Sequence, residues 1–227
     1  MVNFNGNIQE NCLITIDSNR GFLFGDSVFE TIKVLDNKVL FLEDHYFRLM
    51  ASMRICRMEI PMNLTMEYFE SQIINLIEVL APSKSFRVRF SAYRNAEGFY
   101  LPKSREVQFI ITATPLENDL YKIDERNYEV ELYKDFYVSK QLLSSLKTNN
   151  KMLQVMGSIF ANENGYNNCL VVNEDKNVVE ALQSNLFMKT GNVVITPPVS
   201  DGCLNGVMRK QIVEILKKIE GIEVKET

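Results

Sequence analysis

Two turn signals between β-rich runs constrain the fold of the N-terminal half more than any other feature. Asn5-Gly6 lies between short apolar stretches and predicts a tight hairpin, because Asn-Gly readily takes positive φ. The run Ser27 to Leu35 is rich in β-branched and aromatic residues, turns at Asp36-Asn37 and returns through residues 39–41, which predicts a second hairpin. From Glu43 to Met58 the hydrophobic period lengthens to that of a helix. We therefore predict an α+β fold, with strands that do not alternate strictly with helices.

The same two periods predict the remaining elements. In the first half we expect a helix from Asn63 or Thr65 to Leu80, and strands at Phe86 to Tyr93 and Val107 to Thr114. In the second half we expect a strand at Tyr128 to Tyr133, a helix from soon after Lys147 to Gly165, strands at Cys169 to Asn173, Val178 to Ala181, Leu186 to Lys189 and Val193 to Thr196, and a helix over Val207 to Ile219 with Asn205 as its N-cap.

A polar, irregular stretch from Pro115 to Asp124 is the best candidate for a linker. We accordingly predict a first domain at residues 1–117, an interdomain linker at 118–126 and a second domain at 127–227.

Charge and composition narrow the class of partner. The 227 residues are 46% hydrophobic and 24% charged, with a net charge of −4 and both signs interspersed, so no basic face invites nucleic acid or anionic lipid. The N-terminus lacks the pattern of a signal peptide, and no run approaches a membrane span, so we expect a cytoplasmic protein without membrane partners that binds a small molecule.

The cysteines and the single histidine argue against two common kinds of site. The four cysteines are widely spaced without a CxxC pair, so we expect packed hydrophobes and no metal site. His45 alone does not supply the base of a Ser-His-Asp site elsewhere in the chain, which disfavours hydrolase chemistry of the usual kind.

Lys147 follows an apolar pair and two serines at a predicted strand-to-helix boundary. A lysine that is partly desolvated in such a place has a lowered pKa and becomes a nucleophilic amine for a Schiff base. Lys140 and Lys151 are rivals, and an exposed lysine is the simpler interpretation of all three, so local chemistry does not choose among them.

Two further features have both a binding and a plainer interpretation. The segment 205–209 opens a helix after a glycine-bearing loop, which exposes backbone amides that suit a phosphate, although many helix starts bind nothing. Arg48, on the first predicted helix, either adds a bidentate charge to such a phosphate or is solvated on the helix face. Glu180 ends an apolar strand, where a protonated pyridine nitrogen would be a suitable partner, although a strand-end glutamate in solvent is the interpretation that local chemistry favours.

Five motifs lie in one order along the chain. They are Asn19 to Thr31, a glycine-containing segment with a Phe-Glu pair; His45-Tyr46-Phe47-Arg48-Leu49; Lys147-Thr148-Asn149-Asn150; Glu180 with Ser184-Asn185-Leu186-Phe187; and Asn205-Gly206-Val207-Met208-Arg209. In this order they resemble the class IV, or fold-type IV, pyridoxal-phosphate aminotransferases. That family contains branched-chain aminotransferases, D-amino-acid aminotransferases and aminodeoxychorismate lyases.

The resemblance implies a role for each matched residue. It selects Lys147 over Lys151 as the catalytic lysine that holds pyridoxal 5'-phosphate in a Schiff base, and it makes Glu180 the partner of the ring nitrogen. It assigns the cofactor phosphate to Arg48 and to the backbone amides of Val207 and Met208. It also implies a two-domain fold-type IV enzyme, with a small N-terminal α/β domain, a larger β-barrel-like cofactor domain with helices, and a homodimer.

The motifs leave the reaction open between transamination of an amino acid and elimination from 4-amino-4-deoxychorismate. The residues at 29–31 and 205–209 most resemble those of the lyases. Arg87, Arg89, Tyr93 and Arg94 are candidates for the substrate carboxylate, or are surface groups.

Three departures separate the chain from typical relatives. Met152 stands where some members have a tyrosine, and Met208 replaces a frequent threonine, which argues against a typical branched-chain enzyme. The resemblance also implies a further strand segment after residues 223–225, whereas the sequence stops at Thr227. The alternative expectation is therefore a shortened member that binds cofactor or a partner without turnover.

Overall fold

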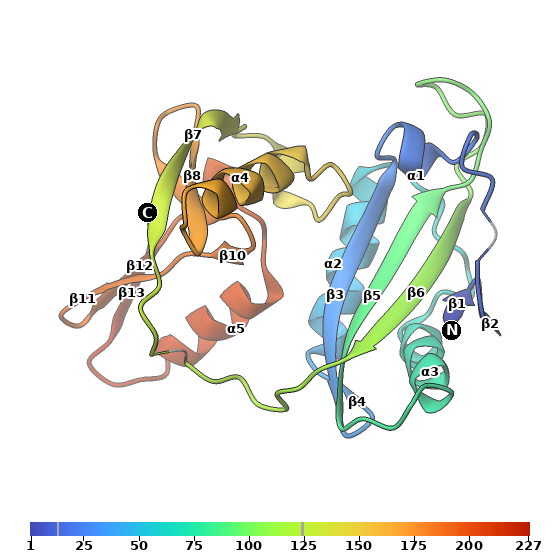
Figure 1. Ribbon diagram of the computed structural model, residues 1–227, viewed down its shortest axis with the longest axis horizontal. Helices are drawn as coiled ribbons and strands as arrows, with labels where there is room; N and C mark the ends of the chain where they lie inside the picture. The colour runs from blue at the N-terminus through green and yellow to red at the C-terminus, as the bar shows by residue number, and fades with distance from the viewer. Residues whose placement is uncertain (13, 124) are drawn as a thin grey trace. The chain divides into compact units, whose positions relative to one another are not determined.

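The computed structural model describes residues 1–12, 14–123 and 125–227. Figure 1 shows its elements, which fall into two compact units: Met1–Ile123 with Lys147–Asn149, and Asp124–Leu146 with Asn150–Thr227. The predicted linker at 118–126 includes Asp124, which lies outside the described residues, and the domain boundaries stay predictions. The first unit contains more residues than the second, whereas a small first domain and a larger second domain were expected.

A six-stranded sheet forms the first unit, with strand order β2-β1-β6-β5-β3-β4. Its strands are β1 (Val2–Phe4), β2 (Asn7–Gln9), β3 (Ser27–Leu35), β4 (Lys38–Val39), β5 (Ser85–Arg94) and β6 (Val107–Pro115). All its neighbouring pairs are antiparallel. Both predicted hairpins are confirmed, with φ of 50° at Asn5 and 88° at Gly6, and of 49° at Asp36 and 57° at Asn37.

Helices α2 (Leu42–Ile55) and α3 (Met66–Glu78) provide the apolar side chains that cover one face of this sheet. Helix α3 begins at Thr65, whose side chain accepts a hydrogen bond from the amide of Tyr68, as the N-cap rule predicts. A further short helix, α1 (Arg20–Leu23), was not predicted, because four residues are too few to show a period.

Strand alternation gives this sheet two different faces. Val28, Val88 and Ala92 belong to the core that the helices cover, so the even-numbered side chains of β3 and β5 lie on the helix face. The odd-numbered side chains, including Phe29 and Arg89, therefore lie on the opposite face, which we call the open face.

The second unit contains two smaller sheets. One has the order β10-β9-β8-β7, and the other has the order β11-β12-β13. Their strands are β7 (Val130–Val138), β8 (Asn168–Asn173), β9 (Val178–Ala181), β10 (Ser184–Asn185), β11 (Met188–Thr190), β12 (Val193–Thr196) and β13 (Glu223–Glu226). The helical elements are η1 (Leu142–Ser145), α4 (Met152–Glu163), η2 (Val199–Asp201) and α5 (Val207–Leu216). The described residues form no closed barrel here, so the β-barrel-like part of the expectation is replaced by two open sheets, while the α+β class is confirmed.

Close packing fixes α4 against the first of these sheets. A Cβ on Gly157 would lie 2.4 Å from Leu182 Cδ2 and 3.3 Å from Tyr133, so only glycine allows this approach. Tyr133 is 2% exposed and is part of the core of this unit, together with Cys169 and Cys203. These two cysteines are packed as the sequence predicted, whereas Cys12 and Cys56 are only partly buried.

The second unit differs from the sequence predictions at three places. Asn205 is not the N-cap of α5; Gly206 takes that position, and the helix ends at Leu216 rather than Ile219. Leu186 and Phe187 lie outside strands, because β10 ends at Asn185 and β11 begins at Met188. Finally, β13 pairs in parallel with β12, a long-range pairing that was not predicted because no local pattern indicates it.

No helix in the described part of the chain combines the length and apolar character that crossing a membrane requires.

Candidate functional site

The lysine segment, Lys147-Thr148-Asn149, is attached to the free edge of β3. The amide of Phe29 donates to the Lys147 carbonyl at 2.8 Å, and the amide of Asn149 donates to the Ser27 carbonyl at 3.0 Å. Thr148 forms an antiparallel bridge with Val28. Strand β4 pairs with the other end of β3, at residues 34 and 35. The lysine segment therefore belongs to the first unit, although the sequence placed it after the linker.

The side chain of Lys147 lies on the open face. Its Nζ is 4.7 Å from the centroid of the Phe29 ring, and the guanidinium carbon of Arg89 is 3.6 Å from the same centroid. Phe29 is 6% exposed, so its ring is held by packing and both cations lie against it. The stem of Lys147 is partly buried, in the setting that the nucleophile hypothesis requires.

The four candidates for substrate binding separate by face. Arg87, Arg89 and Tyr93 are odd-numbered and lie on the open face with Lys147. Arg87 is exposed, whereas Arg89 is half-buried, and burial followed by the charge of Arg87 lowers the pKa of Arg89. Tyr93 is buried and donates to Gln108 Oε1 at 2.6 Å; burial, with a smaller effect of the Cys12 thiol, raises its pKa to about 12.

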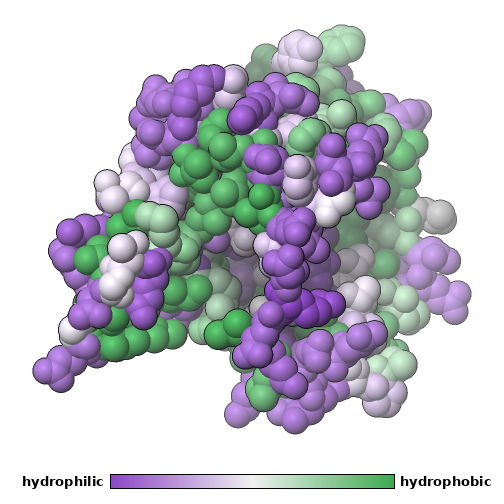
Figure 2. Space-filling view, turned by 60° about the vertical axis from the view of Figure 1, so that its left-hand side comes forward, coloured by the Kyte–Doolittle hydropathy of each residue, from purple (hydrophilic) through white to green (hydrophobic). Residues whose placement is uncertain are grey.

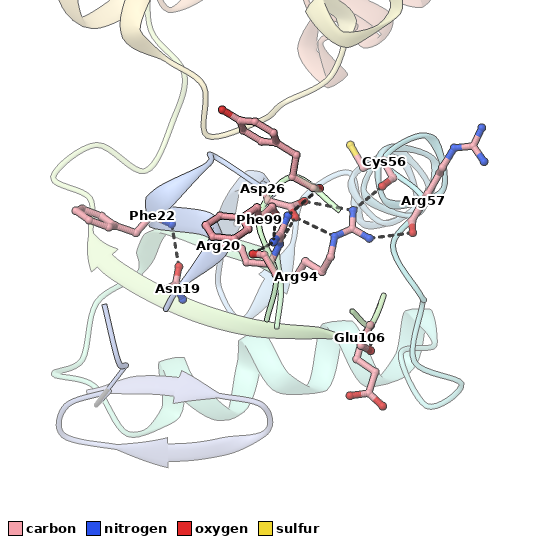
Figure 3. A network of polar contacts seen from close by, with 12 residues as sticks. Asn19, Arg20, Phe22, Asp26, Cys56, Arg57, Arg94, Phe99 and Glu106 are labelled. Carbon is pink, nitrogen blue, oxygen red and sulfur yellow. Dashed lines mark hydrogen bonds and ion pairs between the residues drawn. The ribbon is translucent and has the colours of Figure 1, made fainter. Parts of the chain in front are cut away.

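Arg94, by contrast, is part of a buried network at the end of β5 (Figure 3). Its guanidinium donates to Asp26 through Nε at 2.9 Å and to the carbonyls of Cys56 at 2.7 Å and Arg57 at 3.1 Å. Arg20 donates to the same carboxylate at 2.9 Å and also to the Gly98 carbonyl. This geometry ties the end of α2 to β5 and favours a structural role for Arg94 over contact with substrate.

Arg48 lies on the helix face, where it pairs with the buried carboxylate of Glu30. Its Nε donates to Glu30 Oε1 at 2.8 Å, and its Nη2 donates to Oε2. His45 Nδ1 is hydrogen-bonded to the same Oε2 at 2.7 Å. Burial opposes the ionisation of Glu30, which is 1% exposed, but the hydrogen bonds from His45 and Arg48 outweigh it and lower its pKa.

Glu180 is held beside the approach to α5 in the second unit. It is 8% exposed, and its Oε2 accepts a hydrogen bond from the Leu204 amide at 2.9 Å. Asn185, the neighbour of Glu180 across the β9–β10 pair, donates to the carbonyl of Leu204 at 2.8 Å. The residue before the 205–209 motif is thus fixed on both sides by the Glu180 motif.

The start of α5 has the backbone that an anion site needs. The first-turn amides, including those of Val207 and Met208, have no intrahelical acceptor by the geometry of any helix, and they carry the positive end of the helix dipole. A Cβ on Gly206 would lie 2.0 Å from Asn185 Oδ1, so no other residue fits there without displacing Asn185. Val207 is buried and Met208 is 40% exposed.

The rival lysines lie elsewhere. Lys140 Nζ pairs with Asp175 at 2.7 Å and Asp201 at 3.3 Å, and its hydrogen bonds with these two carboxylates raise its pKa, which is opposite to what a nucleophilic amine needs. Lys151 is the residue before α4.

Sequence reasoning missed four residues of this arrangement: Phe29, Asn149, Asn185 and Gly206. Each lies inside one of the five motifs, but other members of these motifs were assigned the roles, so the sequence did not indicate what these four residues contact. Only the register of β3 against β5 and the position of β10 reveal that Phe29 supports Lys147 and that Asn185 meets Gly206.

Exposed apolar side chains also mark the surface, and Figure 2 shows hydrophobic residues gathered in patches among hydrophilic ones. On α4 the exposed set has helical spacing and consists of Met152, Val155, Met156 and Ile159.

Comparison with known proteins gives a consistent result. The model of the family described as "Amino-transferase class IV" matches residues 27–227. A Methanocaldococcus jannaschii protein named "Putative branched-chain-amino-acid aminotransferase" is 28% identical over 208 residues, which are 91% of this chain and 70% of that protein. The D-alanine aminotransferase of Staphylococcus epidermidis is 26% identical over 211 residues, 91% of this chain and 71% of that enzyme.

A solved structure from Legionella pneumophila, described as "Putative 4-amino-4-deoxychorismate lyase", superimposes with a TM-score of 0.81 at 24% identity, covering 96% of this chain and 78% of that one. The likeness confirms the fold-type IV architecture expected from the motifs. The class IV family consists of enzymes that depend on pyridoxal phosphate, so the expected cofactor is confirmed for the family.

Proposed function

Because this chain belongs to the class IV aminotransferase family, we propose that it acts on an amino acid with pyridoxal phosphate bound covalently through Lys147. The observation that carries this proposal is the placement of the Lys147 amine over Phe29 on the open face, partly buried and on a segment fastened to β3. A lysine amine held at a fixed place beside a ring is positioned to form a Schiff base with an aldehyde cofactor.

The second unit offers groups that fit the cofactor. Glu180 is a buried carboxylate suited to a protonated ring nitrogen, and the α5 amides at Val207 and Met208 suit a phosphate. The hydrogen bonds to Leu204 fix these two features relative to each other. We assign Arg48 to the phosphate as well, as a charge that Glu30 orients.

When bound, pyridoxal phosphate supplies an electron sink for a carbanion at the substrate carbon. The residues of the chain do the rest. Lys147 Nζ would hold the cofactor and would move a proton to or from the substrate carbon. Glu180 keeps a proton on the ring nitrogen, and Arg87 contributes charge for a substrate carboxylate on the open face.

Transamination and elimination from 4-amino-4-deoxychorismate share these residues, so we propose the class of reaction and not one of the two. The two are separated by product: amino-group exchange with 2-oxoglutarate, or pyruvate released from aminodeoxychorismate. We also propose a homodimer, supported by the exposed apolar stripe of α4 and tested by sedimentation. The proposed place of action is the cytoplasm, to be checked by cell fractionation.

The decisive experiment is spectroscopic. The protein mixed with pyridoxal phosphate is expected to absorb in the visible, to lose this band with borohydride, and to carry the reduced cofactor on Lys147 by peptide mass spectrometry. Lys147→Ala should abolish the band, and Lys140→Ala is the matched control that keeps it. A protein that binds the cofactor without this link, or without turnover, would favour a family member that only binds.

A further inference from the structure

We propose that Arg89 is a positioning residue that fastens the lysine segment to the sheet, rather than a ligand for the substrate. The inference rests on the proposed function in one respect only: that function is what makes the position of Lys147 important. The fastening itself is a property of the first unit and can be measured without cofactor.

Arg89 has a direct contact with the lysine segment. Its Nη2 donates to the side-chain Oδ1 of Asn149 at 2.8 Å, and its Nε donates to Ser91 Oγ at 3.1 Å. The backbone of the segment is attached to β3 by two hydrogen bonds, which together form the bridge between Thr148 and Val28. A charge-assisted bond from the neighbouring strand therefore adds substantially to a short attachment.

Phe29 makes this contact rigid. Arg89 pairs with Thr31 in the sheet register, so its side chain must run diagonally along the open face to reach Asn149. The guanidinium carbon lies 3.6 Å from the Phe29 centroid, the distance of a stacked plane, and Lys147 Nζ lies 4.7 Å from the same centroid. One ring thus sets the height of both cations above the sheet.

The two arginines of β5 on the open face, Arg87 and Arg89, differ in exposure and in contacts. Arg87 is exposed, while Arg89 is half-buried, stacked, and bonded to two side chains. A guanidinium held by a ring and two acceptors has little freedom to turn towards an incoming carboxylate. Arg87 suits the substrate, and Arg89 suits the lysine segment.

Hydrogen exchange of the cofactor-free protein tests the fastening. In Arg89→Gln, the amides of Asn149 and Phe29, which carry the two backbone bonds of the segment, should exchange about tenfold faster. Amides at the centre of β5, such as Val88, should keep their protection and report that the sheet is folded. Asn149→Ala should reproduce the acceleration, and the double variant should add nothing further.

Two further variants serve as controls. Arg87→Gln removes the same charge from the same strand and face, and should leave exchange at Asn149 unchanged. Arg89→Lys keeps the charge without the planar fork, and should give an intermediate acceleration even if Arg89→Gln does not fold.

Unchanged exchange at Asn149 in Arg89→Gln, with a raised KM alone, would overturn the proposal and make Arg89 a substrate ligand. With pyridoxal phosphate added, Arg89→Gln should also slow the trapping of cofactor on Lys147 by borohydride. If the wild-type protein forms no such link, the proposed function fails, while the exchange result still decides whether Arg89 fastens the segment.

Discussion

The two faces of the six-stranded sheet treat charge in opposite ways. On the helix face, the buried carboxylate of Glu30 and the partly buried carboxylate of Asp26 each meet two basic side chains at hydrogen-bond distance. On the open face, the odd-numbered residues of β3 and β5 include Lys33, Arg87 and Arg89 but no Asp or Glu, and Lys147 joins them there.

Apart from Arg48, which we assign to the cofactor phosphate, this difference separates structural charge from binding charge. A charge buried under helices must be paired, because an unpaired one costs several kcal/mol. Cations gathered on a face whose strands supply no carboxylate suit an anionic ligand. Burial and, to a smaller extent, the charge of Arg87 lower the pKa of Arg89 on this face. The same residue type thus has different surroundings at two positions of one strand, as Arg87 and Arg94 show.

The largest effect is expected for Lys147→Ala. Losing the amine on the open face should reduce turnover by about 10⁴-fold or more, because both the covalent link and the proton carrier disappear. The melting temperature should change little, since the amine does not belong to the core. Steady-state kinetics beside a thermal melt measure both, and retained turnover would contradict the proposed role.

Glu30→Gln tests the helix face. Two hydrogen-bonded basic groups lose their buried carboxylate, so unfolding free energy should fall by about 3 kcal/mol. Urea denaturation provides the measurement. Glu43→Gln, in the exposed first turn of α2, is the matched control and should cost no more than about 0.5 kcal/mol.

Arg94→Gln should destabilise the first unit by about 2 kcal/mol, because Asp26 keeps Arg20 but the carbonyls of Cys56 and Arg57 lose their donor. KM should hardly change in the fraction that stays folded. A raised KM with unaltered stability would instead return Arg94 to the substrate site.

Arg87→Gln should give the reverse pattern. Stability in urea should stay within about 0.5 kcal/mol of the wild type, since the side chain is exposed. KM for an amino acid or its oxo acid should rise about tenfold, the cost of one charge-assisted contact. Equal effects of Arg87→Gln and Arg94→Gln would remove the distinction between the two faces.

Acid should reveal the smallest effect. The pKa of Glu30 is lower in the folded than in the unfolded protein, so its contribution to stability is complete above the unfolded value, near 4.5, and is lost as pH falls through the folded value. Stability measured between neutral and acid pH should therefore decline less steeply in Glu30→Gln than in the wild type. Identical slopes would show that Glu30 does not carry this dependence.

Local patterns predicted most of the elements because their causes are local. Asn5-Gly6 and Asp36-Asn37 take positive φ wherever the flanking runs pair, and Thr65 caps α3 with its own side chain. The cap of α5 was predicted one residue too early: Gly206 stands there, and a side chain at this position would meet Asn185, a long-range contact that no rule of helix starts includes.

By itself the sequence determined the α+β class, both hairpins of the first half and the order of motifs that identifies the family, since these depend on neighbouring residues and on wording along the chain. The tertiary structure alone decided that Lys147–Asn149 joins the edge of β3, that Arg87 and Arg94 face opposite ways with different partners, and that Phe29 supports two cations. The physical reason is that strand register and packing bring together residues 60 and more positions apart, such as Arg89 and Asn149, and local propensity contains no information about such contacts.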